Sequence, residues 1–299
     1  MEPVISLNHV SKHFGHRIAV NEVSLDIASG QAVALLGPNG AGKTTSIAMM
    51  LGLLHPTTGE IRLLGRTPGH LASREKIGVV LQNVSVPERL KVRECINLVR
   101  GFYPNPRSLD DLLNLAGLAT DSDMQAHLLS GGKMRRLQFA LAMAGNPEVL
   151  FLDEPTVGMD VTSRRQFWDA LRQYVGEGRT LILTTHDLQE ADVMTDRVVV
   201  MHHGLVIADA PPERIKMEFG DRQISFVADD ARLIHVVRQW AEVADVQTSG
   251  RQVTIVTSDS DAVLKRLIHD NWDIRDIRVG GTGLEDAFVR LTREEVSLA

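Results

Sequence analysis

The sequence predicts an α/β domain followed by a smaller α+β domain, and three segments predict the first of these. The segments "EVLFLDEP" and "RTLILTTHD" are continuous apolar runs, which are typical of strands buried on both faces in a parallel sheet. The segment between them, "SRRQFWDALRQYV", places Trp168, Leu171 and Val175 on one face of a helix. Alternation of strand, helix and strand is typical of an α/β domain.

Earlier segments extend the same alternation. "VSLDI" alternates Val23, Leu25 and Ile27, as a half-buried strand does. "QAVALLG" predicts a short buried strand that ends at a glycine, and "KTTSIAMMLGLL" follows it with helical spacing. "RSLDDLLNLAGLA" predicts a helix that begins at Ser108, because Ser108 and Asp111 have the spacing of a capping box.

The pattern restarts after residue 217, so we expect one domain at residues 1–217 and another at 218–299. In the second, "RQISFVAD", "RQVTIVT" and "DIRDIRV" predict strands. Two helices between them and a last helix capped by Thr282 complete this α+β domain. The side chains expected to point inward are Leu233, Val236, Val237 and Trp240 on the first helix, Val263, Leu264, Leu267 and Ile268 on the second, and Leu284, Phe288 and Leu291 on the last.

Composition narrows the classes of partner. The chain has 32 basic and 38 acidic residues, and this net charge of −6 argues against a nucleic-acid partner. Cys95 is the only cysteine, so no disulfide can form within the chain, which fits a reducing compartment. No apolar run reaches the roughly 18 residues that a membrane span needs. We expect the protein to meet a membrane only through another chain.

The segment "GPNGAGKT", which begins at Gly37, fits the pattern G-x-x-x-x-G-K-[ST] between a predicted strand and a predicted helix. Backbone N–H groups of such a loop form an anion site at the helix N-terminus. We expect Lys43 to reach the β- and γ-phosphates and Thr44 to hold Mg²⁺. The sequence therefore predicts a site for a nucleoside triphosphate.

An acidic pair, Asp153 and Glu154, ends the predicted strand "EVLFLDEP". We expect Asp153 to reach the magnesium ion and Glu154 to take a proton from an attacking water. Such a pair alone is often only the N-cap of a helix. Beside a phosphate-binding loop, the catalytic interpretation is favoured.

A second glycine-containing loop, "LLSGGKMRR" from Leu128 to Arg136, precedes another helical segment. With "LSGG" ahead of "LDEP" and "GPNGAGKTT" upstream, residues 4–217 resemble the ATP-binding cassette (ABC) ATPase family. Gln82 in "IGVVLQN" matches the family's Q-loop, "VGMD" at 157–160 matches its D-loop, and His186 in "ILTTHD" matches its switch histidine. Phe14 matches the aromatic residue that stacks on adenine.

The resemblance implies a P-loop NTPase cassette with a parallel-core sheet, N-terminal antiparallel strands and a helical subdomain at about residues 84–145. It implies ATP hydrolysis, with Glu154, His186 and Gln82 as catalytic residues. It also implies a magnesium site at Thr44, Gln82 and Asp153. The ATP-binding residues that it implies are Phe14, Ala19, Gly37, Pro38, Asn39, Gly40, Ala41, Gly42, Lys43, Thr44, Thr45, Leu129, Ser130, Gly131, Gly132, Lys133 and Asp160.

The resemblance also explains the two loops. In this family two cassettes pair head to tail, and the "LSGG" of one closes over ATP on the phosphate loop of the other. It implies a homodimer that attaches to a separate permease at the cytoplasmic face of the inner membrane. The segment between Gln82 and Ser130 would hold a cytoplasmic helix of that permease. The ending "GLEDAFVRLTREE" resembles the tail of bacterial drug- and antibiotic-exporter ATPases, so we expect export.

A soluble ABC ATPase of translation, DNA repair or regulation is the alternative. Those of translation or DNA repair usually carry two cassettes in one chain, long coiled-coil arms or zinc modules, and the sequence shows none of these. Three positions depart from the common pattern. Phe14 stands where tyrosine is frequent, and Val157 stands where a serine or threonine hydroxyl could hold water. Lys133 replaces the commoner glutamine; it is either a tolerated surface change or an extra positive charge near the ATP across the interface.

Overall fold

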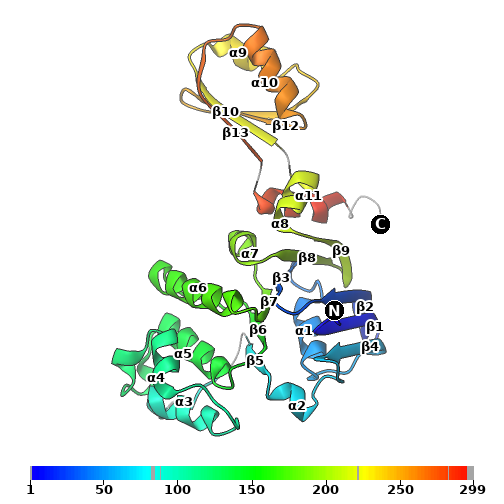
Figure 1. Ribbon diagram of the computed structural model, residues 1–299. Coiled ribbons are helices and arrows are strands. Elements are labelled where there is room, and N and C mark those ends of the chain that lie inside the picture. The colour runs from blue at the N-terminus through cyan, green and yellow to red at the C-terminus, as the bar shows by residue number, and fades with distance from the viewer. Residues whose placement is uncertain (1, 82–84, 88, 221, 282, 295–299) are drawn as a thin grey trace. The chain divides into compact units, whose positions relative to one another are not determined.

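The computed structural model describes residues 2–81, 85–87, 89–220, 222–281 and 283–294 (Figure 1). Its contacts divide the chain into two compact units, Met1–Ala210 and Pro211–Ala299. The expected boundary between residues 217 and 218 lies within helix α8 (Pro212–Phe219), whereas the contacts divide the chain before this helix. The difference arises because α8 packs against α11 (Leu284–Glu294), the last helix of the second unit.

The main sheet of the first unit has six strands in the order β5-β6-β7-β3-β8-β9. Its strands are β5 (Ile77–Val80), β6 (Val149–Asp153), β7 (Thr180–Thr184), β3 (Ala32–Leu36), β8 (Arg197–His202) and β9 (Leu205–Ala210). The first five run parallel and β9 is antiparallel. Every residue of β3, β6 and β7 is buried. This confirms the parallel core that the apolar runs predicted.

A second, antiparallel sheet has the order β2-β1-β4, with β2 at Arg17–Ile27, β1 at Ile5–Phe14 and β4 at Thr58–Leu63. Val23, Leu25 and Ile27 are buried, as the alternation predicted. Helix α1 (Lys43–Met50) contacts β2 and β4 and shares one apolar core with both sheets. The phosphate loop that precedes α1 is therefore fixed by the main sheet on one side and by β2 on the other.

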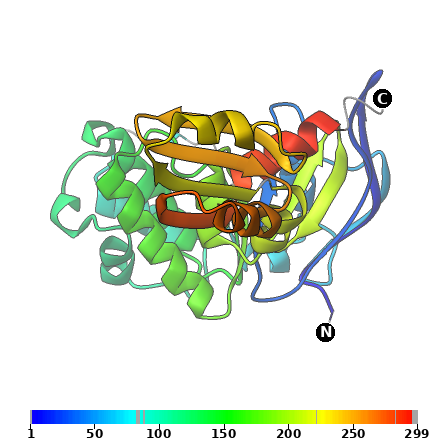
Figure 2. The same ribbon diagram turned by 90° about the horizontal axis from the view of Figure 1, so that it is seen from above.

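Helices gather beside β5 and β6 in Figure 1, and Figure 2 shows these green and blue-green helices from above. They are α3 (Val92–Arg100), α4 (Leu109–Leu115) and α5 (Gly131–Met143), with α6 (Val161–Gly176) alongside. Ser108 caps α4 as predicted, because its Oγ accepts a hydrogen bond from the backbone N of Asp111 at 3.0 Å. Short elements complete the unit: α2 (Leu71–Arg74), the 3₁₀ turns η1 (Ala119–Asp121) and η2 (Ala126–Leu128), and α7 (Leu188–Met194). Among the described residues, no helix is both long and apolar enough to cross a membrane.

The second unit begins with α8 and ends with α11. Between them lie β10 (Arg222–Ala228), α9 (Ala231–Val237), β11 (Val243–Ser249), β12 (Gln252–Thr257), α10 (Ser260–His269) and β13 (Ile274–Gly281). Their sheet is antiparallel with the order β11-β12-β10-β13. A β-α-β-β-α-β chain with this order is a ferredoxin-like fold. The predicted α+β class is therefore confirmed, with one strand, β11, that the sequence did not reveal.

Two inward-pointing side chains of this unit were predicted wrongly. Leu233, Val237 and Leu267 are buried as expected. Val236 is 37% exposed and Ile268 is 62% exposed. Each helix of a two-layer fold buries only one narrow stripe against the sheet. Val236 and Ile268 each directly follow or precede a residue of that stripe, which turns them about 100° away from it. Thr282, the predicted cap, lies outside the described residues.

Candidate active site

The phosphate loop connects β3 to α1, and Gly42 forms its last turn. Gly42 has a left-handed backbone with φ of 107° and is the N-cap of α1. A Cβ atom at this position would lie 2.5 Å from the carbonyl oxygen of Ala19 on β2, so only glycine fits. Among the described residues, no side chain caps this helix end. Its first backbone N–H groups are thus free to donate to a phosphate.

A pocket of about 240 Å³ opens over this loop. It is lined by Phe14, Arg17, Ala19, Asn39, Gly40, Ala41, Gly42, Lys43, Thr44, Thr45, Asp153 and Glu154. The structure thus gathers residues 39–45 of "GPNGAGKTT" with the aromatic residue and the acidic pair, while Gly37 and Pro38 do not line the pocket. Arg17 was not predicted; it comes from β2 and no motif marks it. Gln82, predicted to be catalytic and a magnesium ligand, lies outside the described residues.

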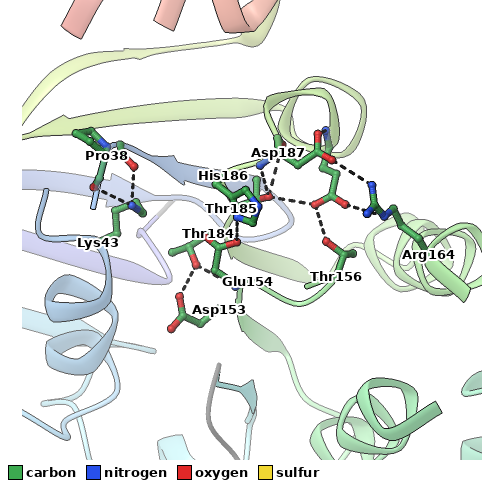
Figure 3. Close-up of polar contacts among 12 residues, drawn as sticks. Pro38, Lys43, Asp153, Glu154, Thr156, Arg164, Thr184, Thr185, His186 and Asp187 are labelled. Carbon is green, nitrogen blue, oxygen red and sulfur yellow. Dashed lines mark hydrogen bonds and ion pairs between the residues drawn. The ribbon is translucent and has the colours of Figure 1, made fainter. Parts of the chain in front are cut away.

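Lys43 is the first residue of α1 and lines the pocket. Its Nζ donates hydrogen bonds to the backbone oxygens of Gly37 at 2.6 Å and Pro38 at 3.1 Å (Figure 3). Burial lowers the pKa of Lys43, and the nearby carboxylates of Glu154 and Asp153 oppose that shift. The ammonium is therefore held between the loop and the acidic pair, where the phosphates of a nucleotide would replace the carbonyl oxygens as its partners.

Asp153 ends β6 and is 5% exposed. Its Oδ1 accepts a hydrogen bond from Oγ1 of Thr184, at the end of β7, at 2.5 Å. Asp153 and the hydroxyl-bearing Thr44 line the same pocket. Carboxylate and hydroxyl oxygens are the hard ligands that Mg²⁺ prefers, so the residues present fit a magnesium ion. Thr184 was missed by the sequence analysis, because a threonine inside an apolar strand carries no signal of its own.

Glu154 has a left-handed backbone, with φ of 51°. This conformation is strained for a residue with a side chain, and such strain gathers at functional sites. Its backbone N donates to the carbonyl oxygen of Thr184 at 3.1 Å, and its Oε2 lies 2.6 Å from Nδ1 of His186. The sequence named each of these two residues as catalytic, and the structure places their side chains in direct contact (Figure 3). A carboxylate held in this way can accept a proton from a water in the pocket.

Behind this pair lies a polar network that no motif predicted. Glu190 is 6% exposed, and its Oε2 accepts hydrogen bonds from the hydroxyls of Thr156 at 3.0 Å and Thr185 at 3.1 Å. Burial raises the pKa of Glu190. Arg164 of α6 bonds Asp187 at 3.2 Å and lies 3.7 Å from Glu190 (Figure 3). The network ties the segment after Glu154 to the segment that carries the histidine.

The "LSGG" segment occupies a different place. Of the described residues, those from 129 to 133 and Asp160 do not line the phosphate-loop pocket. Ser130 caps α5, its Oγ accepting from the backbone N of Lys133 at 3.4 Å. Asp160 caps α6 through the backbone N of Ser163 at 2.9 Å. A Cβ at Gly132 would lie 3.1 Å from Oγ of Ser163, so this glycine allows α5 and α6 to approach closely.

Comparison with known proteins decides the family. The sequence model of the ABC transporter family matches residues 20–157. Nod factor export ATP-binding protein I of Rhizobium sp. (strain N33) is 36% identical over 302 residues, which cover 98% of each chain. This chain belongs to the ABC transporter family. The protein of the same name from Sinorhizobium fredii (strain NBRC 101917 / NGR234) is 37% identical to this ABC protein, over 98% of its chain and 87% of the relative.

Solved structures agree with that assignment. The dimeric, post-hydrolysis ATP-binding cassette MJ0796, bound to ADP and Pi, superposes with a TM-score of 0.63 at 27% identity, over 69% of this chain and 98% of that one. CbiO1 from Clostridium perfringens, part of the ABC transporter complex cbiONQ, gives a TM-score of 0.65 at 27% identity, over 73% of this chain and 92% of that one. The chain is therefore an ABC ATPase, which binds and hydrolyses ATP as the ATP-binding subunit of a transporter.

For this ABC ATPase, Phe14→Ala is expected to weaken ATP binding about tenfold, because stacking of a base on an aromatic ring is worth about 1–3 kcal/mol. The Phe14 ring is 49% exposed at the pocket, with Nζ of Lys12 at 5.3 Å from its centroid. Phe14→Tyr keeps the ring and should bind ATP as the wild type does. Titration calorimetry measures both variants, and equal affinity of Phe14→Ala and wild type would show that adenine binds elsewhere.

Proposed function

We propose that two copies of this chain pair head to tail, drive a separate membrane permease and power export. Relatives named for export match 98% of the chain, the second unit included, which favours an exporter over the soluble alternative. We place the protein at the cytoplasmic face of the inner membrane, held there by the permease. We propose that the first unit is the nucleotide-binding domain and that the second is an accessory domain.

Within one site, Lys43 and the N-terminal end of α1 hold the phosphates. Glu154 accepts the proton of the attacking water, and His186 keeps the carboxylate turned toward that water. Thr44 and Asp153 are the proposed magnesium ligands, with Gln82 completing them, and the bound ion supplies charge neutralisation at the phosphates. The strained backbone of Glu154 and its 2.6 Å contact with His186 support this assignment.

We propose the dimer because the residues of "LSGG" do not line the phosphate-loop pocket of their own chain. Ser130 stands at the N-terminal end of α5, a 13-residue helix whose positive end suits an anion. A phosphate held on the loop of a second copy provides that anion. ATP then joins the two copies, and its hydrolysis separates them.

An apolar groove of about 640 Å³ beside the helices α3 and α5 supports the proposed contact with a permease. We call it the lateral groove; its lining includes Leu53, Val79, Leu98, Val99 and Leu141. Leu53 is 61% exposed and Leu98 is 49% exposed. Apolar grooves of this kind accept the apolar face of an amphipathic helix. The occupant that we propose is a cytoplasmic helix of the permease.

Two variants of the lateral groove, Leu53→Glu and Leu98→Glu, test the permease. Coexpressed with the permease, each is expected to lose most of its recovery with the membrane fraction, because a carboxylate cannot enter an apolar contact unpaired. Their ATP affinity in isolation should stay at the wild-type value. Val193→Glu, on a valine of α7 that is 66% exposed outside the groove, is the control and should stay with the membrane.

Retention of both groove variants would show that the permease binds elsewhere. Absence of the wild-type protein from the membrane fraction would favour the non-transport alternative instead.

A further inference from the structure

Lys133 forms an ion pair within its own chain. Neither of its two expected roles, a tolerated surface change or a positive charge near the ATP of the other copy, includes this pair. Its Nζ lies 2.8 Å from Oδ1 of Asp121, at the end of η1. We infer that Lys133 and Arg136 are positioning residues that fasten the start of α5 to residues 116–121. They thereby orient Ser130 toward the ATP of the second copy. This inference rests on the proposed head-to-tail dimer, and it gives the charge of Lys133 a role inside its own chain.

The two cations lie one turn apart on α5, so they share one face of the helix. Arg136 is 8% exposed, and its Nη1 donates to the backbone oxygens of Ala116 and Gly117, each at 3.1 Å. Gly117 has φ of 61°, and a Cβ there would lie 2.6 Å from the same Nη1. The end of α4 is thus shaped to receive the guanidinium. Lys133 makes the corresponding contact one turn earlier.

The buried carboxylate of Asp121 holds the ammonium of Lys133 in this ion pair. Asp121 is 8% exposed, and its backbone N bonds the carbonyl oxygen of Leu118 at 3.0 Å, which fixes the turn. A carboxylate this deeply buried is costly to leave without its cation. Reaching for a phosphate in another chain would require breaking the pair. The lysine is therefore a strut between η1 and α5.

Lys133 also contacts Ser130 directly. The backbone N of Lys133 donates to Oγ of Ser130 at 3.4 Å, while the side chain of the same residue holds Asp121. Arg136 also bonds Oε1 of Gln166 on α6 at 3.0 Å. The serine that we propose to meet the γ-phosphate is thus linked through one residue to a buried acid. Loosening that link should weaken contact between copies and leave the phosphate-loop pocket unchanged.

The test measures ATP-driven dimerisation of Lys133→Gln, Asp121→Asn and the double variant, all carrying Glu154→Gln so that bound ATP persists. Sedimentation gives the dimer dissociation constant, and calorimetry gives ATP affinity of the dilute subunit. Each single variant is expected to weaken the dimer about threefold to tenfold. The double variant should be no weaker than either single one, because both remove the same contact. ATP affinity should stay constant, and Lys133→Arg should restore the dimer.

Controls separate the possible failures. Lys91→Gln removes a similar but exposed pair with Asp123, at 3.0 Å, and should leave the dimer unchanged. If Lys133 contacts the ATP of the other copy, Asp121→Asn will leave the dimer intact or strengthen it, which overturns the inference. Equal dimerisation of all variants would mean that Lys133 is a tolerated surface change and overturns it too. Ser130→Arg tests the proposed function: a dimer that survives this variant refutes the head-to-tail site, whatever Lys133 does.

Discussion

Glu154→Gln is expected to lower kcat for ATP hydrolysis by about 10²–10⁴-fold, the usual contribution of a general base. The glutamine amide has the same shape, but it cannot take the proton of the attacking water. Binding should persist, because Lys43 and the loop amides hold the phosphates. ATP should then accumulate between two copies, so the variant should run as a dimer in gel filtration with ATP. Phosphate release at saturating ATP measures the rate.

Glu75→Gln, an exposed residue at the end of α2, is the matched control and should hydrolyse ATP at the wild-type rate. A wild-type rate for Glu154→Gln would place the base elsewhere. A slow variant that stays monomeric with ATP would leave the base in place but contradict the role of ATP in pairing.

Lys43→Ala is expected to weaken ATP binding at least about tenfold to a hundredfold, since a hydrogen bond to a charged group contributes about 1.5–3 kcal/mol. The Lys43 ammonium already lies within hydrogen-bond reach of the loop carbonyls, so it needs little rearrangement to meet phosphate oxygens. Lys76→Ala removes an exposed lysine that pairs with Glu148 and should bind ATP normally. Calorimetry that finds unchanged affinity for Lys43→Ala would refute the phosphate-loop assignment.

Mixing Lys43→Ala with Ser130→Arg asks which chain supplies each loop. In a mixed dimer, one site joins the intact phosphate loop of the Ser130→Arg chain to the intact "LSGG" of the Lys43→Ala chain. Partial hydrolysis by the mixture, with none by either variant alone, is the expected result. Normal hydrolysis by Ser130→Arg alone would contradict a site shared between chains.

The parts of the site that sequence could predict are those whose chemistry is local. "GPNGAGKTT" contains its own turn, glycine and cation, so its pocket follows from one short segment. Arg17 reaches the pocket from β2, and Thr184 of β7 bonds Asp153 at its edge; their residue types are common in any strand. The Glu190 network joins three segments, so only the folded chain reveals it. The assigned roles of these residues stay predictions until the variants are measured.

In the fold, too, the sequence predicted only the elements whose pattern is local. Strands β3, β6 and β7 were predicted because they are wholly buried, which leaves an uninterrupted apolar run. β11 escaped notice because it lies at a sheet edge and buries only Val246. Val236 and Ile268 are apolar by type, yet neighbours in the sequence already fill the stripe that faces the sheet. Periodicity finds a helix more reliably than it finds which of two adjacent apolar residues is buried.

The pairing of α8 with α11 has a consequence for how this chain could change over evolution. The two helices contact each other, while the ferredoxin-like segment between them forms its own sheet and core (Figure 1). The segment therefore leaves and rejoins the chain at neighbouring points. A short linker between the helices could replace it without separating them. Such a segment resembles an inserted domain. A homologue can lose it, exchange it or gain a new ligand site in it while α8 and α11 stay paired.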